Sequence, residues 1–105
     1  ADGRWLAAVD ADRAVRLREA NTGRVVRTLL QAPSRVDALA FSPDGTRLVT
    51  GGADRAVRVW DVESGQELLA LLGAEGAVSA VAWGADGHRV YALDGAVREW
   101  RADPP

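Results

Sequence analysis

The side chains that most often carry catalysis are sparse in this sequence of 105 residues. His88 is the single histidine, and it follows an Asp-Gly pair, which is typical of a turn. A histidine in such a turn is usually solvated and acts as neither general base nor metal ligand. The chain has no cysteine, so thiolate metal sites are excluded, and a lone histidine is too few for a transition-metal site. We expect no metal and no cofactor.

The serine, aspartate and glycine residues also lack the spacing of nucleophilic, calcium-binding and phosphate-binding motifs. Ser42 and Ser64 stand in turn sequences, where hydroxyls bond the local backbone, and no serine lies in a nucleophile-elbow pattern. Asp44 and Asp54 lack the density of oxygen ligands of a calcium loop, so each is predicted to accept backbone N–H bonds in a turn. No glycine cluster opens a helix after a strand, as phosphate binding requires. We therefore predict no catalytic residue, and that the protein is not an enzyme.

Composition indicates a globular chain without a polyanionic or lipid partner. Hydrophobic residues make up 48% and charged residues 27%, and the net charge of −2 offers no basic face for nucleic acid. No apolar run approaches the roughly 20 residues that span a bilayer, and no signal peptide is visible at the start. We expect a cytoplasmic protein. All 13 positive residues are arginine and isoleucine is absent, which suggests a GC-rich bacterium. The lack of methionine leads us to expect a processed or trimmed chain.

An internal repeat organises the sequence. Asp2, Asp44 and Asp86 are each followed by glycine and lie 42 residues apart. The five residues 12–16 recur unchanged at 54–58, and a similar block at 94–98 follows at a spacing of 40. A fixed period of this length is the signature of a repeat architecture.

Each repeat divides into four short strand-like runs. In the best copy these are residues 36–41, 47–50, 56–62 and 66–72, separated by glycine, proline and aspartate turn signals. Residues 57–60 alternate with the period of two that a strand requires. The runs 68–72 and 78–83 are apolar at successive positions, which predicts strands covered on both faces by neighbouring sheets.

These residues resemble the WD-repeat β-propeller family. The best copy carries residues 36–45 (VDALAFSPDG), then 48–52 (LVTGG), then Asp54, and then 57–61 (VRVWD), in which Trp60-Asp61 matches the pair that names the family. The resemblance implies an all-β fold of four-stranded antiparallel blades arranged as part of a ring. Ten strands are expected, equal to about two and a half blades.

The resemblance also implies a buried polar network within each blade, formed by histidine, Ser/Thr, aspartate and tryptophan. Both candidate histidine positions are filled by other residues, in the pairs at 31–32 (QA) and 73–74 (GA). The network residues that remain are Thr50, Asp54, Trp60, Asp12 and Trp100. We expect blade rigidity to depend more on strand pairing and apolar stacking than in a regular repeat.

The blade boundaries are predicted from the same alignment. Residues 1–30 form a blade without its first strand, 31–72 a complete blade, and 73–105 a blade without its last strand, all in one partial propeller. A closed ring of seven such repeats would need about 294 residues. The chain is therefore either a piece of a longer propeller or a unit that closes a ring with its own copies.

The resemblance implies that a protein or peptide binds where the loops before the first strand and after the second strand meet. The residues at these positions are Arg35, Asp37, Ala77, Ser79, Ala11 and Ala53. The main hypothesis is a non-catalytic binding scaffold or sensor segment. The alternative is a purely structural set of repeats that completes a larger or homo-oligomeric propeller, and a propeller-based enzyme is a distant third.

Two further residue sets have competing interpretations. Arg16, Arg58 and Arg98 recur at equivalent positions, and they form either a basic stripe for an acidic partner or guanidinium groups paired with neighbouring acids. Trp5 has no aromatic equivalent in the other repeats, so it is the tryptophan most worth examining as a surface group, whereas Trp60 is expected to pack in the core.

Overall fold

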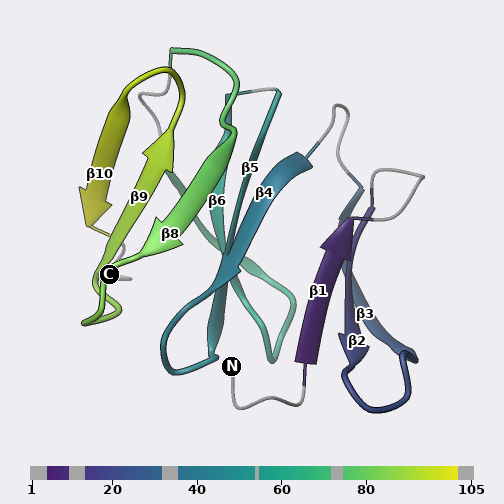
Figure 1. The fold of residues 1–105 in the computed structure, drawn as a ribbon. Helices are drawn as coiled ribbons and strands as arrows, with labels where there is room; N and C mark the ends of the chain where they lie inside the picture. Colours follow the sequence, from purple (N-terminus) through teal and green to yellow (C-terminus); the bar gives the residue numbers. More distant parts are fainter. Residues whose placement is uncertain (1–4, 10–13, 32–35, 54, 72–74, 102–105) are drawn as a thin grey trace.

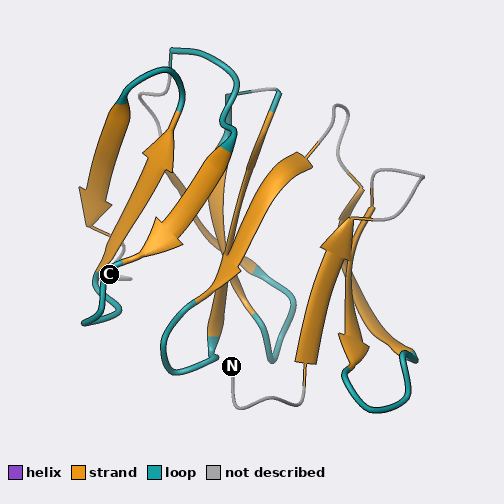
Figure 2. Ribbon diagram, in the orientation of Figure 1, coloured by secondary structure: helices purple, strands orange, loops and turns teal. Residues whose placement is uncertain are grey.

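The computed structural model describes residues 5–9, 14–31, 36–53, 55–71 and 75–101, which form three antiparallel sheets without any helix (Figures 1 and 2). The strands follow one another as simple meanders in each sheet. Their bounds are β1 (Trp5–Val9), β2 (Ala14–Glu19), β3 (Val25–Gln31), β4 (Val36–Phe41), β5 (Arg47–Gly52), β6 (Val57–Asp61), β7 (Glu67–Leu71), β8 (Ala80–Trp83), β9 (Arg89–Leu93) and β10 (Val97–Arg101). The all-β fold of ten strands predicted from the sequence is confirmed.

The sheets stand side by side as three layers. Strands β1–β3 form the first sheet, β4–β7 the central sheet, and β8–β10 the third sheet. Figure 1 shows the central sheet between the other two. The predicted run 36–41 matches β4, whereas β5 extends two residues further than predicted, to Gly52, and β6 and β7 are each shorter by a residue at both ends.

The Asp-Gly pairs at 44–45 and 86–87 form the β4–β5 and β8–β9 turns, whereas Asp2 lies outside the described residues. Asp44 Oδ1 accepts hydrogen bonds from the Thr46 backbone N–H at 3.0 Å and from the Ser42 hydroxyl at 2.7 Å. Gly45 has φ +74°, in the left-handed region that glycine occupies without steric cost. The interpretation of Asp44 and Ser42 as turn residues is confirmed.

Alternation along the two inner strands of the central sheet, β5 and β6, directs one set of side chains to each neighbouring sheet. Leu48 and Trp60 join Val15 and Leu17 in one apolar cluster between the first and central sheets. The residues one position away face the third sheet instead, where they form a second cluster with side chains of β9 and β10. Its buried members are Val49, Val57, Val59, Leu71, Val78, Val90 and Ala92. Within the described residues, the core therefore consists of two interlayer clusters, one on each face of the central sheet.

Two of the strands predicted to be covered on both faces are not. Leu68 of β7 is exposed, and so are Ala80 and Ala82 of β8. Strand β7 is the edge of the central sheet, and β8 belongs to an outer sheet of the three layers. The prediction for residues 68–72 and 78–83 was wrong because apolar composition does not reveal whether a strand lies at an edge or in an outer layer.

Two hydrogen bonds tie the central sheet to the third sheet. The indole N–H of Trp83 donates to the Ala40 carbonyl at 3.0 Å, which joins β8 to β4. The Val78 backbone N–H donates to the Gly52 carbonyl at 2.9 Å. These bonds fix how far β8 slides along the central sheet.

A candidate protein-binding edge

The start of β4, the end of β5, residues 75–79 before β8 and the β9–β10 turn lie at one edge of the layers, the upper edge in Figure 1. Gly52 brings the central and third sheets together at this edge, because it pairs with Val36 and its carbonyl accepts the bond from Val78. Asp37 and Ser79 each follow one of these residues in the chain. The central and third sheets therefore present Asp37 and Ser79 at the same edge.

Four of the six predicted binding residues lie in the part of the chain that the structure describes. Asp37, Ala53, Ala77 and Ser79 are all exposed. The structure brings them to the upper edge, which we define by these four residues and Glu75. The other two, Arg35 and Ala11, lie outside the described residues.

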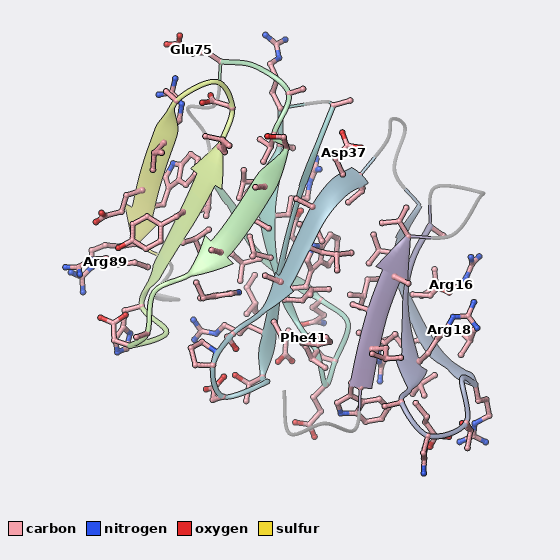
Figure 3. The ribbon with its side chains drawn as sticks, in the orientation of Figure 1. Arg16, Arg18, Asp37, Phe41, Glu75 and Arg89 are labelled. Carbon is pink, nitrogen blue, oxygen red and sulfur yellow. The ribbon has the colours of Figure 1, made fainter. Side chains whose placement is uncertain are left out.

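Asp37 sits at an irregularity in strand pairing. The register of β4 with β5 shifts between Val36, which pairs with Gly52, and Ala38, which pairs with Gly51. An extra residue at such a bulge bends the strand and re-aims its side chain. Figure 3 shows Asp37 at the upper end of β4, on the same side of the molecule as the segment that carries Glu75.

The Ser79 hydroxyl is directed to backbone rather than to a reactive group. Its Oγ donates to the Leu93 carbonyl at 3.3 Å, and its backbone N–H donates to the same oxygen at 2.9 Å. This hydroxyl therefore helps to hold the start of β8 against β9. His88, the one histidine of the sequence, lies in the β8–β9 turn at the other end of β8, where it cannot act as a base for Ser79.

An ion-paired cluster that the sequence analysis did not predict supports the same edge. The Asp94 side chain is only 1% exposed and accepts a bond from Arg98 Nε at 2.7 Å. The same carboxylate accepts the Glu75 backbone N–H at 2.8 Å and the Ala96 backbone N–H at 3.3 Å. These bonds, with the Arg98 bond the largest, lower the pKa of Asp94 to about 2. Asp94 thereby anchors the segment that leads into β8.

Arg58 and Arg98, two of the recurring arginines, contact acidic side chains. Arg58 Nε lies 2.9 Å from Glu67 Oε1, and Arg98 contacts both Asp94 and Glu75. Hydrogen bonding by Asp94 raises the pKa of the Arg98 guanidinium. The interpretation of paired guanidinium groups is confirmed for Arg58 and Arg98. The signal for the Asp94 cluster was present in the sequence, in an aspartate four residues before a recurring arginine, but its third partner comes from another loop.

One part of the predicted buried network is a direct contact. The Trp60 indole N–H donates to the Thr50 hydroxyl at 3.1 Å, and both residues are buried. Trp100 is partly buried against the cluster between the central and third sheets. Asp54 and Asp12 lie outside the described residues.

Trp5 lines a cleft at the opposite, lower edge. The cleft has a volume of about 560 Å³ and lies between the first and central sheets. It is lined by Trp5, Leu17, Val26, Arg27, Asp44, Gly45, Thr46, Asp61, Val62 and Glu63. Because Trp5 also packs against the buried cluster there, it serves as an interlayer residue as well as a surface group.

The described residues contain no group of three or more histidine, aspartate or glutamate side chains arranged to hold a metal ion. Within the same residues, no helix has the length and apolar character to span a membrane.

Comparison with known proteins bears on the fold. Residues 23–61 match the family model of the WD domain, G-beta repeat, which spans β3 and the first three strands of the central sheet. No curated protein is similar enough to the chain to count as a relative. WD repeats generally act as protein-interaction scaffolds and are typically not enzymes. The match at residues 23–61, together with the three antiparallel sheets, supports a WD-repeat family for this chain.

Proposed function

We propose that this chain is a non-catalytic binding module that holds a protein or peptide partner at its upper edge. The observation that carries the proposal is the meeting of Asp37 and Ser79 around Gly52, where two sheets contribute exposed side chains to one surface. The Asp94 carboxylate also stabilises this edge, because it accepts hydrogen bonds from the Glu75 backbone and from Arg98. Internal hydrogen bonds that hold the Glu75 segment suit binding, because that segment needs less ordering when a partner arrives.

The chemistry of the edge favours a partner that offers a positive or hydrogen-bond-donating group. Asp37 and Glu75 are acidic and exposed, and Ala53 and Ala77 leave space for a backbone to approach closely. A carboxylate that accepts a charge-assisted hydrogen bond adds both affinity and orientation. The proposed partner is neither a nucleic acid nor a membrane. We also propose that the protein is bacterial and cytoplasmic.

A random peptide library displayed on phage and selected on this chain tests the proposal. Selected peptides, measured by fluorescence polarisation, should bind the Asp37→Arg variant at least about tenfold more weakly, the loss expected for one charge-assisted contact. The matched control is Glu63→Arg, which makes the same charge change at the lower edge and should bind within about twofold of wild type. If no peptide is enriched, or if Asp37→Arg binds as wild type does, the proposed edge is wrong.

A second candidate function is structural, in which the repeats complete a larger or homo-oligomeric ring. The outer faces of the first and third sheets favour it, since Leu6 on one and Val97 on the other are exposed apolar residues.

A further inference from the structure

The cleft at the lower edge is formed by side chains of two different sheets. Its first wall is on the side of the first sheet that faces the central sheet, where Trp5 packs against the buried cluster that contains Leu17. Its second wall consists of the β4–β5 turn and the β6–β7 turn of the central sheet. The cleft therefore lies within the stack of sheets. Its volume of about 560 Å³ is in the range of about 300–1,000 Å³ that is typical of ligand pockets.

Arg27 joins the two walls. It belongs to β3, and its Nη1 donates to the Ser64 carbonyl of the β6–β7 turn at 3.3 Å. Gly65 leaves space for the Arg27 side chain, because a Cβ at position 65 would lie 2.6 Å from Arg27 Cδ. Arg27 is therefore held by the protein itself as part of the cleft wall.

Three acidic side chains also line the cleft: Asp44, Asp61 and Glu63. The hydrogen bonds to the Asp44 carboxylate come from Ser42 and Thr46, and all of them reach Oδ1. Asp61 Oδ2 accepts the Ser64 backbone N–H at 3.1 Å. Because an ionised carboxylate has about four acceptor sites, Asp44 and Asp61 retain acceptor capacity for a ligand.

The negative charge of the cleft is only partly compensated. Among the residues that the structure describes, the acids that form ion pairs are Glu19, Glu67, Glu75, Asp94 and Glu99, and those of the cleft are not among them. Hydrogen bonds, the largest of them from Ser42, lower the pKa of Asp44 to about 2, with a smaller contribution from Arg47. Asp44 is therefore ionised at neutral pH, and acids outnumber arginine in the lining of the cleft.

The combination of an aromatic ring with acids is specific to the interface between the first and central sheets. Trp5 is equivalent to Arg47 in the next repeat, and Asp61 is equivalent to Arg101. The interface between the central and third sheets thus has arginine at both of these positions. Since that interface forms without the combination, stacking of the sheets does not require it.

We propose that the cleft binds an arginine side chain of a peptide or protein partner. The planar guanidinium stacks on the Trp5 ring, whose face attracts cations. Its N–H groups donate to the carboxylates of the cleft. Arginine suits this site better than other cations do, because its guanidinium combines five donors in a fixed fork with a flat surface that stacks on aromatic rings, whereas a lysine ammonium is a compact point charge.

This second site goes beyond the binding function proposed for the upper edge and does not depend on it. Asp37 and Ser79 lie at the opposite edge of the layers from the cleft. A peptide held at the upper edge does not contact the cleft, so Glu63→Arg remains a control for that edge. The two proposals can therefore fail separately.

Titration of the isotope-labelled chain with the peptide acetyl-Ala-Arg-Ala-amide, followed by nuclear magnetic resonance, tests the proposal. The backbone amide signals of Thr46 and Glu63 report on the cleft, and those of Asp37 and Ser79 report on the upper edge. We expect saturable shifts at the cleft. The matched peptide with citrulline in place of arginine keeps the shape but lacks the charge, and should bind there at least about tenfold more weakly. The peptide with glutamate instead should not bind at the cleft.

Two substitutions test the residues assigned to the site. Trp5→Leu removes the aromatic face but keeps an apolar side chain, and Glu63→Gln removes one charge from an exposed turn. Each should weaken binding of the arginine peptide at least about threefold. Glu75→Gln is the matched control, because it makes the same change at the upper edge, and the arginine peptide should bind to the cleft of this variant within about twofold of wild type.

Circular dichroism should show the β spectrum of wild type for each variant, and Glu63→Gln keeps the test valid if Trp5→Leu does not fold. The absence of shifts at the cleft, equal affinity for the arginine and citrulline peptides, or tighter binding of the glutamate peptide would overturn the inference. Unchanged affinity in Glu63→Gln and in a folded Trp5→Leu would do the same.

Discussion

The stability of the upper edge depends on the ionisation of one carboxyl group, that of Asp94. Its carboxylate accepts hydrogen bonds from Arg98, from the Glu75 backbone and from the Ala96 backbone, all of which favour the ionised form. The pKa of Asp94 is therefore lowered from 3.8 to about 2. A carboxyl that binds its proton more weakly when the chain is folded stabilises the fold only while it is ionised.

The lowered pKa of Asp94 predicts how the stability of the fold depends on pH. The stabilisation from Asp94 should be complete above about pH 5 and should be lost as the pH falls from about 4 through 2. Asp94→Asn should lower the melting temperature at neutral pH and make the acid side of the stability profile shallower. Thermal unfolding followed by circular dichroism from acid to neutral pH measures both effects.

Asp86→Asn is the matched control for that profile. Asp86 also has a lowered pKa, but the largest cause is a single hydrogen bond from the His88 backbone N–H in an exposed turn. The largest cause at Asp94 is instead a charge-assisted bond from an arginine side chain. Replacement of Asp86 should therefore change the profile less than Asp94→Asn does. An equal change in both variants would contradict the role assigned to the Asp94 cluster.

The Thr50 and Trp60 contact allows a second prediction at the same scale. Thr50→Val keeps the shape of the side chain but removes the acceptor for a buried indole N–H, so the free energy of unfolding should fall by about 1–3 kcal/mol. Thr22→Val removes a hydroxyl from an exposed turn and should change the free energy of unfolding by no more than about 0.5 kcal/mol. Urea unfolding followed by tryptophan fluorescence compares the two. Equal effects would mean that the buried hydrogen bond adds nothing to stability.

At the scale of strands, Gly51 sets how closely the central and third sheets approach. A Cβ added at this position would lie 2.6 Å from Val78 Cγ1 and 3.2 Å from Val81 Cγ1. The equivalent residues, Val9 and Leu93, have larger side chains. The glycine is therefore required by the neighbouring sheet and not by its own strand.

Gly51→Ala should consequently reduce the free energy of unfolding by about 1–3 kcal/mol, the usual cost of overpacking a core. Because the clash is with Val78, the double variant Gly51→Ala, Val78→Ala should cost less than the sum of the two single changes. Chemical denaturation of wild type, both single variants and the double variant gives this coupling directly. Additive effects would show that the alanine methyl is accommodated without contact with Val78.

At the scale of the whole molecule, self-association should appear in thermal stability. Any contact made only by folded chains stabilises them by mass action, so the melting temperature should rise with protein concentration. Leu6→Arg, which places a charge on the exposed apolar face of the first sheet, should remove most of this dependence. Differential scanning calorimetry over a wide range of concentration measures the slope. A melting temperature that is independent of concentration would contradict completion of a ring by copies of this chain.

The sequence was sufficient for the elements, because their signals are local. The spacing of Asp44 and Asp86 marked equivalent turns, and period-two alternation over residues 57–60 marked a strand whose two faces enter different clusters. Turn formation depends on a few adjacent residues, so Asp44 and Ser42 could be assigned without knowledge of the rest of the chain. The positions of Asp37 and Ser79 at one edge followed from the family resemblance.

Tertiary structure alone decided which surfaces are covered and which distant groups meet. Trp83 reaches the Ala40 carbonyl, and Asp94 accepts a bond from the Glu75 backbone across 19 residues of sequence. Val57 and Val97 share one repeat position, yet one is buried and the other exposed, because only the first has a sheet beside it. Local pattern determines what a strand is, whereas the cost of leaving apolar area and polar groups uncovered depends on neighbours far away in the chain.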